Sequence, residues 1–208
     1  MEEYLIVISL LAVPILLAVT VHEVAHGWVA DKLGDHTARL AGRLTLNPLK
    51  HLDPVGTLVF LVTRMVGWAK PVPVNPYNLR HPQRDMIWVA AAGPAANIIL
   101  ASAFALLYHA FNNWHGMAFN PIVTPVAAMA KIGVYINLGL ATFNILPIPP
   151  LDGSNILMGI LPRNLAIQYE RITPYGFIIL LVLIFTNFVS TVLFPIINGM
   201  ADLLLKGI

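Results

Sequence analysis

The chain has 208 residues, of which 58% are hydrophobic and only 11% are charged. Soluble globular proteins carry about a quarter charged residues, so this composition excludes both a water-soluble domain and a disordered chain. The 12 Lys and Arg against 10 Asp and Glu give a net charge of +2. The basic residues fall between apolar stretches, which is typical of a membrane protein and predicts no nucleic-acid partner. Because cysteine is absent, a metal ion must be bound by His, Asp or Glu.

The first apolar stretch, Tyr4–Ala30, is long enough to cross a hydrocarbon layer of roughly 30 Å at 1.5 Å per residue. A cleaved signal peptide is the alternative, but Glu2 and Glu3 stand where basic residues are expected, and the apolar stretch is too long. The further apolar stretches are Val55–Gly67, Met86–Phe111, Ile132–Leu161 and Pro174–Leu205.

Basic residues predict how these stretches cross the membrane. Eight of them lie between the first stretch and Met86, whereas Asn112–Pro121 has none. The positive-inside rule then places residues 32–85 in the cytoplasm and the N-terminus outside. Val55–Gly67 is short and includes Arg64, so we expect it to re-enter or lie in the interface, with a true crossing as the alternative. Pro174–Leu205 is either one long tilted helix or a hairpin turning near Pro195.

These patterns predict an all-α polytopic membrane protein. We expect a bundle of about four to six transmembrane helices with a short membrane-edge β or re-entrant segment. Residues 1–208 show no repeat and no separate soluble region, so we expect a single transmembrane domain.

The strongest motif is His22-Glu23-Val24-Ala25-His26, an H-E-x-x-H pattern within the first apolar stretch. Helix residues four apart lie on one face, so both imidazoles can reach one zinc ion. Glu23 can point at the open coordination position and accept a proton from water. These polar residues are costly in hydrocarbon unless they are paired, hydrated or metal-bound, which favours a zinc site. A polar cluster that packs helices together and haem ligation are the alternatives.

A zinc hydrolase needs a third protein ligand. The candidates beyond the first stretch are His36, His51, Asp53, His81, Asp85 and Asp152. Depth favours Asp152, because it lies about 16 Å from the cytoplasmic end near Arg163, while His22 lies roughly 18 Å from the end near Gly34. Asp152 also follows a proline-rich stretch that cannot be a continuous helix. Broken backbone at this depth is tolerated where it is buried or lines a watery cavity. The alternative is a proline kink with Asp152 capping the next helix.

The H-E-x-x-H motif is followed, in a later apolar stretch, by Asn144-Ile145-Leu146-Pro147-Ile148-Pro149-Pro150-Leu151-Asp152-Gly153. Together these motifs resemble the site-2 protease family of intramembrane zinc metalloproteases, whose second signature is N-x-x-P-x-P-x-L-D-G. The resemblance extends to Arg43–Pro54 and Gly67–Pro76, which are similar to compact bacterial and archaeal members. It covers nearly the whole chain, without the PDZ and CBS domains of larger members.

The resemblance implies roles for individual residues. His22, His26 and Asp152 would bind one Zn²⁺ ion, and Glu23 would be the general base. Asn144 would help position substrate or water. Asn97 matches the family's G-x-x-x-N element, which begins here at Gly93, and would lie near the site as a substrate-binding or oxyanion residue. The alternative for Asn97 is a hydrogen bond to a neighbouring helix.

The sequence therefore predicts a multi-pass protein of the cell membrane that cleaves transmembrane protein substrates in or near their membrane-spanning segments. We expect the active site nearer the cytoplasmic side, in contact with the lipid bilayer. The alternatives are a metal-ion carrier that uses the same His and Asp residues, and an inactive relative that only binds membrane helices. The sequence predicts no oligomeric state.

Overall fold

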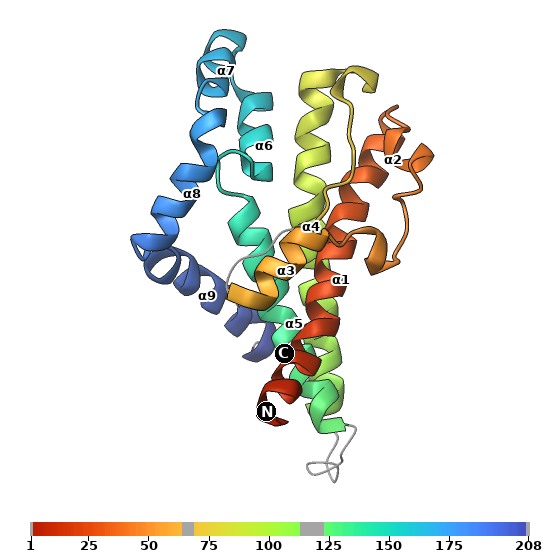
Figure 1. The fold of residues 1–208 in the computed structure, drawn as a ribbon, viewed down its shortest axis with the longest axis vertical. Coiled ribbons are helices and arrows are strands. Elements are labelled where there is room, and N and C mark those ends of the chain that lie inside the picture. The colour runs from red at the N-terminus through yellow and green to blue at the C-terminus, as the bar shows by residue number, and fades with distance from the viewer. Residues whose placement is uncertain (1, 64–68, 113–122, 207–208) are drawn as a thin grey trace.

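The computed structural model describes residues 2–63, 69–112 and 123–206, which are mostly helical (Figure 1). The longer helices are α1 (Glu2–Lys32), α3 (Pro54–Thr63), α4 (Pro82–Asn112), α5 (Val123–Asn144), α6 (Asp152–Ile160), α7 (Arg163–Glu170), α8 (Gly176–Phe185) and α9 (Phe194–Lys206). The short ones are α2 (Thr37–Leu40), η1 (Pro48–Lys50), η2 (Pro76–Asn78), η3 (Thr173–Tyr175) and the π-helical η4 (Val189–Leu193).

Five helical segments of the described residues are long and apolar enough to cross a membrane. They are Ser9–Lys32, Pro82–Asn112, Val123–Asn144, Arg163–Phe185 and Val189–Lys206. This number confirms the prediction of an all-α protein with four to six transmembrane helices.

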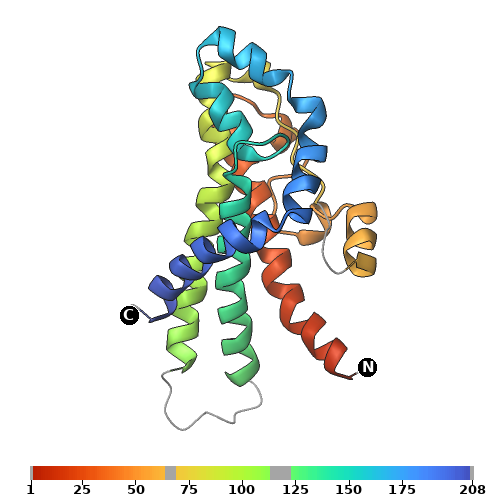
Figure 2. The same ribbon diagram turned by 90° about the vertical axis from the view of Figure 1, so that its left-hand side faces the viewer.

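The centre of the molecule is formed by α4 and α5, which run side by side with α1 against them (Figures 1 and 2). Small side chains make this packing close, as is usual between membrane helices. Ala101 and Ala105 of α4 and Ala130 of α5 are almost completely buried, and helix α9 adds Ile197 to the same cluster. At Gly133 of α5, a Cβ atom would lie 2.7 Å from the Phe104 ring, so the two backbones approach too closely for a larger residue.

The stretch Ile132–Leu161 is divided in the structure. Helix α5 ends at Asn144, and a proline-rich loop, residues 145–151, leads into α6. The prolines of this loop cannot continue the helix, as the sequence predicted. The Gln83 side chain of α4 holds the far end of α6, because its amide donates hydrogen bonds to the carbonyls of Met158, Gly159 and Leu161 at 3.1–3.4 Å.

The segment expected to re-enter or lie in the interface contains α3. Its 10 residues span about 15 Å, which is too short to cross the hydrocarbon layer alone. Figure 2 shows α3 at the edge of the molecule, away from α4 and α5. Residues 64–67 of the expected segment lie outside the described residues. Among the described residues, the expected β element is a single antiparallel bridge between Leu52 and Ala69.

The last apolar stretch is neither one tilted helix nor a hairpin at Pro195. Figures 1 and 2 show a corner between α8 and α9, and the chain turns at Asn187, whose φ is 59°. Asparagine tolerates this left-handed conformation better than most residues. Pro195 instead lies near the start of α9, directly after the π-helical turn η4 and within the continuous helical segment Val189–Lys206.

We predict that Gly133→Ala weakens the packing of α4 against α5. The added methyl group must displace the Phe104 ring, and overpacking of this kind costs about 1–3 kcal/mol. Thermal unfolding of the purified protein in detergent measures the loss. The control is Gly139→Ala in the same helix, where the nearest atom is 4.0 Å from the new Cβ. Equal stability of the two variants would contradict this account of the packing.

Candidate metal centre

Helix α1 carries both histidines of the H-E-x-x-H motif on one face. The two Nε2 atoms lie 3.0 Å apart, and the rings meet edge to face with their centroids 4.6 Å apart. The two side chains are only 10% and 12% exposed. The motif therefore places both imidazoles on the same face of α1, as its spacing predicts.

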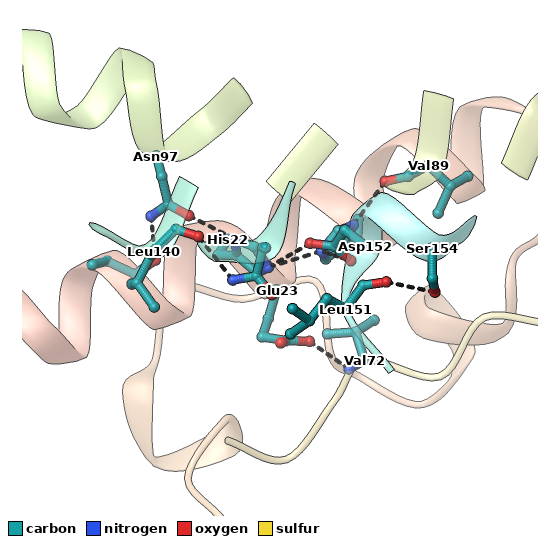
Figure 3. Close-up of polar contacts among 12 residues, drawn as sticks. His22, Glu23, Val72, Val89, Asn97, Leu140, Leu151, Asp152 and Ser154 are labelled. Carbon is teal, nitrogen blue, oxygen red and sulfur yellow. Dashed lines mark hydrogen bonds and ion pairs between the residues drawn. The ribbon is translucent and has the colours of Figure 1, made fainter. Parts of the chain in front are cut away.

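Asp152, the first residue of α6, brings its carboxylate to these imidazoles. Oδ2 lies 3.2 Å from His22 Nε2, and Oδ1 lies 3.4 Å from His26 Nε2 (Figure 3). Leu151 is the N-cap of α6 and no side chain caps this end, so Asp152 does not serve as the helix cap. Among the described residues, His22, His26 and Asp152 are the group of His and acidic side chains whose ligand atoms all lie within 4.8 Å of one another.

Hydrogen bonds on the far side of each imidazole fix its tautomer. His22 Nδ1 donates to the Asn97 side-chain oxygen at 2.6 Å, and His26 Nδ1 donates to the Val89 carbonyl at 2.7 Å. Both acceptors lack a hydrogen, so each Nδ1 carries a proton, and in the neutral form of each ring the lone pair lies at Nε2. Asp152 Oδ2 is buried and has no hydrogen-bond partner among the described residues. Carbonyl and amide acceptors of this kind commonly orient metal-binding histidines.

This donor set fits a divalent cation such as zinc. Three electron-rich atoms face one another in a buried place, an arrangement that is unfavourable without a positive charge among them. Zinc binds imidazole nitrogen and carboxylate oxygen at about 2.0–2.2 Å, so tetrahedral ligands lie about 3.3–3.6 Å from one another. The two Nε2 atoms lie 3.0 Å apart, and each of them has one of the two carboxylate oxygens at 3.2 or 3.4 Å, which is close to this range.

One stripe of α4 supports the centre. Val89, Gly93 and Asn97 are spaced by four residues and therefore lie on the same helix face. Val89 and Asn97 bind the two imidazoles, and Gly93 lies between them. A Cβ at Gly93 would lie 2.6 Å from His22 Cε1 and closer still to His26 Nε2. Glycine is required here because the rings fill the space that any side chain would occupy.

Asn137 of α5 is a supporting residue that the sequence analysis missed. It is completely buried, and its side-chain oxygen accepts a hydrogen bond from Asn97 Nδ2 at 2.8 Å. Its own amide donates to the Gly133 carbonyl. Asn97 Nδ2 also donates to the Ala18 carbonyl at 3.1 Å, so its amide group can have only one orientation. A polar residue in the middle of an apolar span was the available signal.

The structure places the two predicted substrate-binding asparagines differently. Asn97 uses its oxygen for His22 and its nitrogen for Ala18 and Asn137, which favours support of the imidazole over contact with a substrate. Asn144 is half-buried at the end of α5, and its amide donates to the Leu140 carbonyl of its own helix. Its role towards substrate or water stays a prediction.

Glu23, the predicted general base, is half-buried next to the centre. Its Oε2 accepts a hydrogen bond from the backbone N–H of Val72 at 2.7 Å. Figure 3 shows the carboxylate turned towards Val72, on the side of α1 that the segment around Val72 crosses. Its second oxygen, Oε1, is not used in this hydrogen bond.

The other ligand candidates have local structural roles. His51 is buried and donates to the Thr45 carbonyl, and Asp53 accepts from the Gly56 N–H at the start of α3. His36 lies 2.8 Å from Asp31. Asp85 accepts from the His81 N–H at the start of α4.

Comparison with known proteins places the chain next to a peptidase family. A model of peptidase family M50 matches residues 10–186. The chain is 41% identical over 199 residues to YwhC of Bacillus subtilis (strain 168), covering 94% of this chain and 89% of that protein. It is 29% identical over 198 residues to Rip2 of Mycolicibacterium smegmatis, covering 90% of this chain and 71% of that protein. Both relatives carry the name "putative zinc metalloprotease". No solved structure matches the chain.

We predict that Gly93→Ala weakens zinc binding, because the new methyl group pushes both imidazoles out of place. Displacement of groups that orient metal ligands typically costs about 10–100-fold in affinity. Competition with a chelator measures the affinity. Gly199→Ala is the control, because a Cβ there meets nothing within 4 Å. Equal zinc affinity in both variants would show that the rings do not need this space.

We also predict that Asn137→Leu weakens zinc binding, by up to about tenfold, because the Asn97 amide loses one of the partners that orient it towards His22. The matched control is Asn144→Leu, the same substitution in the same helix, because the side-chain hydrogen bond of Asn144 among the described residues stays within α5. Zinc affinities are compared by the same chelator competition. If the two variants bind zinc equally well, Asn137 has no part in orienting the centre.

Proposed function

The chain belongs to peptidase family M50, the site-2 protease family, and from this premise we propose that it is an intramembrane zinc metalloprotease. Its substrates would be membrane proteins, cleaved in or near a transmembrane segment. The observation that carries the proposal is the meeting of Asp152 with His22 and His26, beside Glu23, on a helix α1 that is long and apolar enough to cross a membrane.

The proposed cofactor is one Zn²⁺ ion, bound by His22, His26 and Asp152. A zinc ion with three protein ligands keeps an open position, lowers the pKa of water there and polarises a carbonyl group. The residues supply the matching protonation states, because the bonds to Asn97 and Val89 leave a lone pair on each Nε2.

Glu23 is the proposed general base. Its carboxylate would take a proton from the attacking water and pass it to the leaving amine. A peptide bond within a helical substrate is shielded by the hydrogen bonds of that helix, so the substrate must unwind locally first. Substrates with helix-breaking residues near the cleaved bond should therefore be preferred. Asn144, at the rim of the proline loop, is the proposed residue for positioning the substrate or water.

The centre would lie inside the bilayer. His22 is ten residues from the end of the first candidate span at Lys32, which corresponds to about 15 Å along the helix. The basic residues after Lys32 support a cytoplasmic position for that end and an outside N-terminus. We propose that residues 1–208 act as one domain, with water entering from the cytoplasmic side.

Two other functions use the same cluster. A metal-ion carrier would bind zinc in transit and would not need Glu23 as a base. An inactive relative would bind membrane helices without cleaving them. The position of Glu23, directly after a ligand and beside the centre, favours hydrolysis.

We predict that Glu23→Gln retains zinc and loses cleavage of a transmembrane test peptide. Removal of a general base typically costs about 10²–10⁴-fold in rate. Asp152→Ala should instead lose zinc as well as activity. The measurements are zinc per chain by elemental analysis and peptide cleavage by mass spectrometry, both on purified protein in lipid nanodiscs.

Glu170→Gln in α7 is the control, because Glu170 is exposed. Unchanged cleavage by Glu23→Gln would remove Glu23 from the mechanism. Zinc transport into vesicles by Glu23→Gln, with no cleavage by the wild type, would favour the carrier. Undiminished zinc in Asp152→Ala would remove Asp152 as a ligand.

A further inference from the structure

The segment Ala69–Asn75, which we call the strap, follows the bridge to Leu52 and crosses α1 beside Glu23. Its middle reads Pro71-Val72-Pro73. Proline has no N–H, so Val72 carries the one backbone donor of these three residues. That donor is used for Glu23 Oε2 at 2.7 Å. Hydrogen bonds to a charged carboxylate are among the stronger ones in proteins.

The side chain of Val72 fixes the strap against α1. It is only 7% exposed. A Cβ at Gly27 would lie 2.8 Å from Val72 Cγ1, so the missing side chain of Gly27 makes room for Val72. Gly27 follows Glu23 by four residues and lies on the same face of the helix. The strap therefore lies directly on the part of α1 that carries the base.

The strap is held at both of its ends. At the first end, the N–H of Lys70 donates to the His51 carbonyl at 2.9 Å, and buried Arg43 donates to the Lys70 carbonyl at 2.7 Å. At the other end, the N–H of Asn75 donates to Asp35 Oδ2 at 2.7 Å. These bonds leave the middle of the strap little freedom to move away from Glu23.

Asp35 is a firm anchor because it is completely buried and fully hydrogen-bonded. Burial alone would raise its pKa, but the hydrogen bonds from Thr37, Asn78 and Asn75 outweigh burial and lower the pKa of this carboxyl. Asp35 is therefore ionised at neutral pH, and its charge strengthens its bond to the strap.

We propose that the Val72 N–H is a positioning group for the general base: it holds Oε2 of Glu23 and leaves Oε1 for the proton of the attacking water. This inference rests on the proposed proteolytic function. The strap acts through Glu23 alone and binds neither of the imidazoles nor Asp152, so its loss should affect turnover and not zinc binding.

The test compares Val72→Pro, which removes the N–H, with Val72→Ala, which retains it. Val72 precedes a proline and so favours the extended backbone that proline also adopts. We expect Val72→Pro to lower kcat about 10–100-fold, with KM within about twofold and zinc content unchanged. Val72→Ala should retain kcat within about threefold of the wild type. Equal kcat in the two variants, or a higher kcat in Val72→Pro, would overturn the proposal.

Gly27→Ala is the second variant, for the case in which Val72→Pro does not fold. Its methyl group meets Val72 Cγ1 and Leu44 Cδ2 at 2.8 Å each, so it displaces Val72 from α1 together with Leu44 and leaves the N–H of Val72 intact. We expect lower kcat with unchanged zinc content, and wild-type kcat in this variant would count against the proposal.

Hydrogen exchange at Val72 provides a readout that needs no catalysis. Its amide is the one exchangeable backbone site in residues 71–73. Glu23→Ala should speed its exchange about tenfold or more, whereas Glu23→Gln keeps an acceptor and should not. Unchanged exchange in Glu23→Ala would overturn the hydrogen bond itself. If the wild type cleaves no substrate, the proposed function fails, and the exchange result still stands separately.

Discussion

The main constraint on this structure is that two imidazole nitrogens and a carboxylate, which repel one another, are held close together in an apolar bundle. The two imidazole nitrogens lie 3.0 Å apart and the nearest carboxylate oxygens lie 3.2 and 3.4 Å from them, and the bonds to Asn97 and Val89 direct the Nε2 lone pairs of the neutral rings towards this group. Such a group is costly to bury unless a cation joins it. Helices α1, α4, α5 and α6 therefore keep in place an arrangement that a metal ion would stabilise.

Close approach of backbones makes this arrangement possible. Lipid tails are as apolar as leucine, so membrane helices associate through tight packing and hydrogen bonds. Gly93 brings α4 against the imidazoles, and Gly133 brings α5 against Phe104. A Cβ at Gly153 would overlap the carbonyls of Ile145 and Leu146, so α6 begins directly against the loop that precedes it. In each case, the absence of a side chain sets the distance between two elements.

Much of the centre was predictable, because side chains on a helix follow its period. The spacing of His22 and His26 and the depth of Asp152 predicted residues that the structure brings together. The corner at Asn187 was not predicted, because no glycine or proline marks it, whereas Pro195, where a turn was expected, lies within a helical segment. The carbonyl of Val89 and the N–H of Val72 could not have been predicted from the sequence, because nearly every residue has such backbone groups. The fold alone determines which of them contacts His26 or Glu23.

The position of Asp152 has a consequence for biosynthesis. The imidazoles belong to α1, whereas the carboxylate belongs to α6, which follows the long helices α4 and α5 and the proline loop. A growing chain therefore lacks the third member of the cluster until α6 is being made. Any chemistry that needs all three side chains thus becomes available only after α4 and α5 have been synthesised.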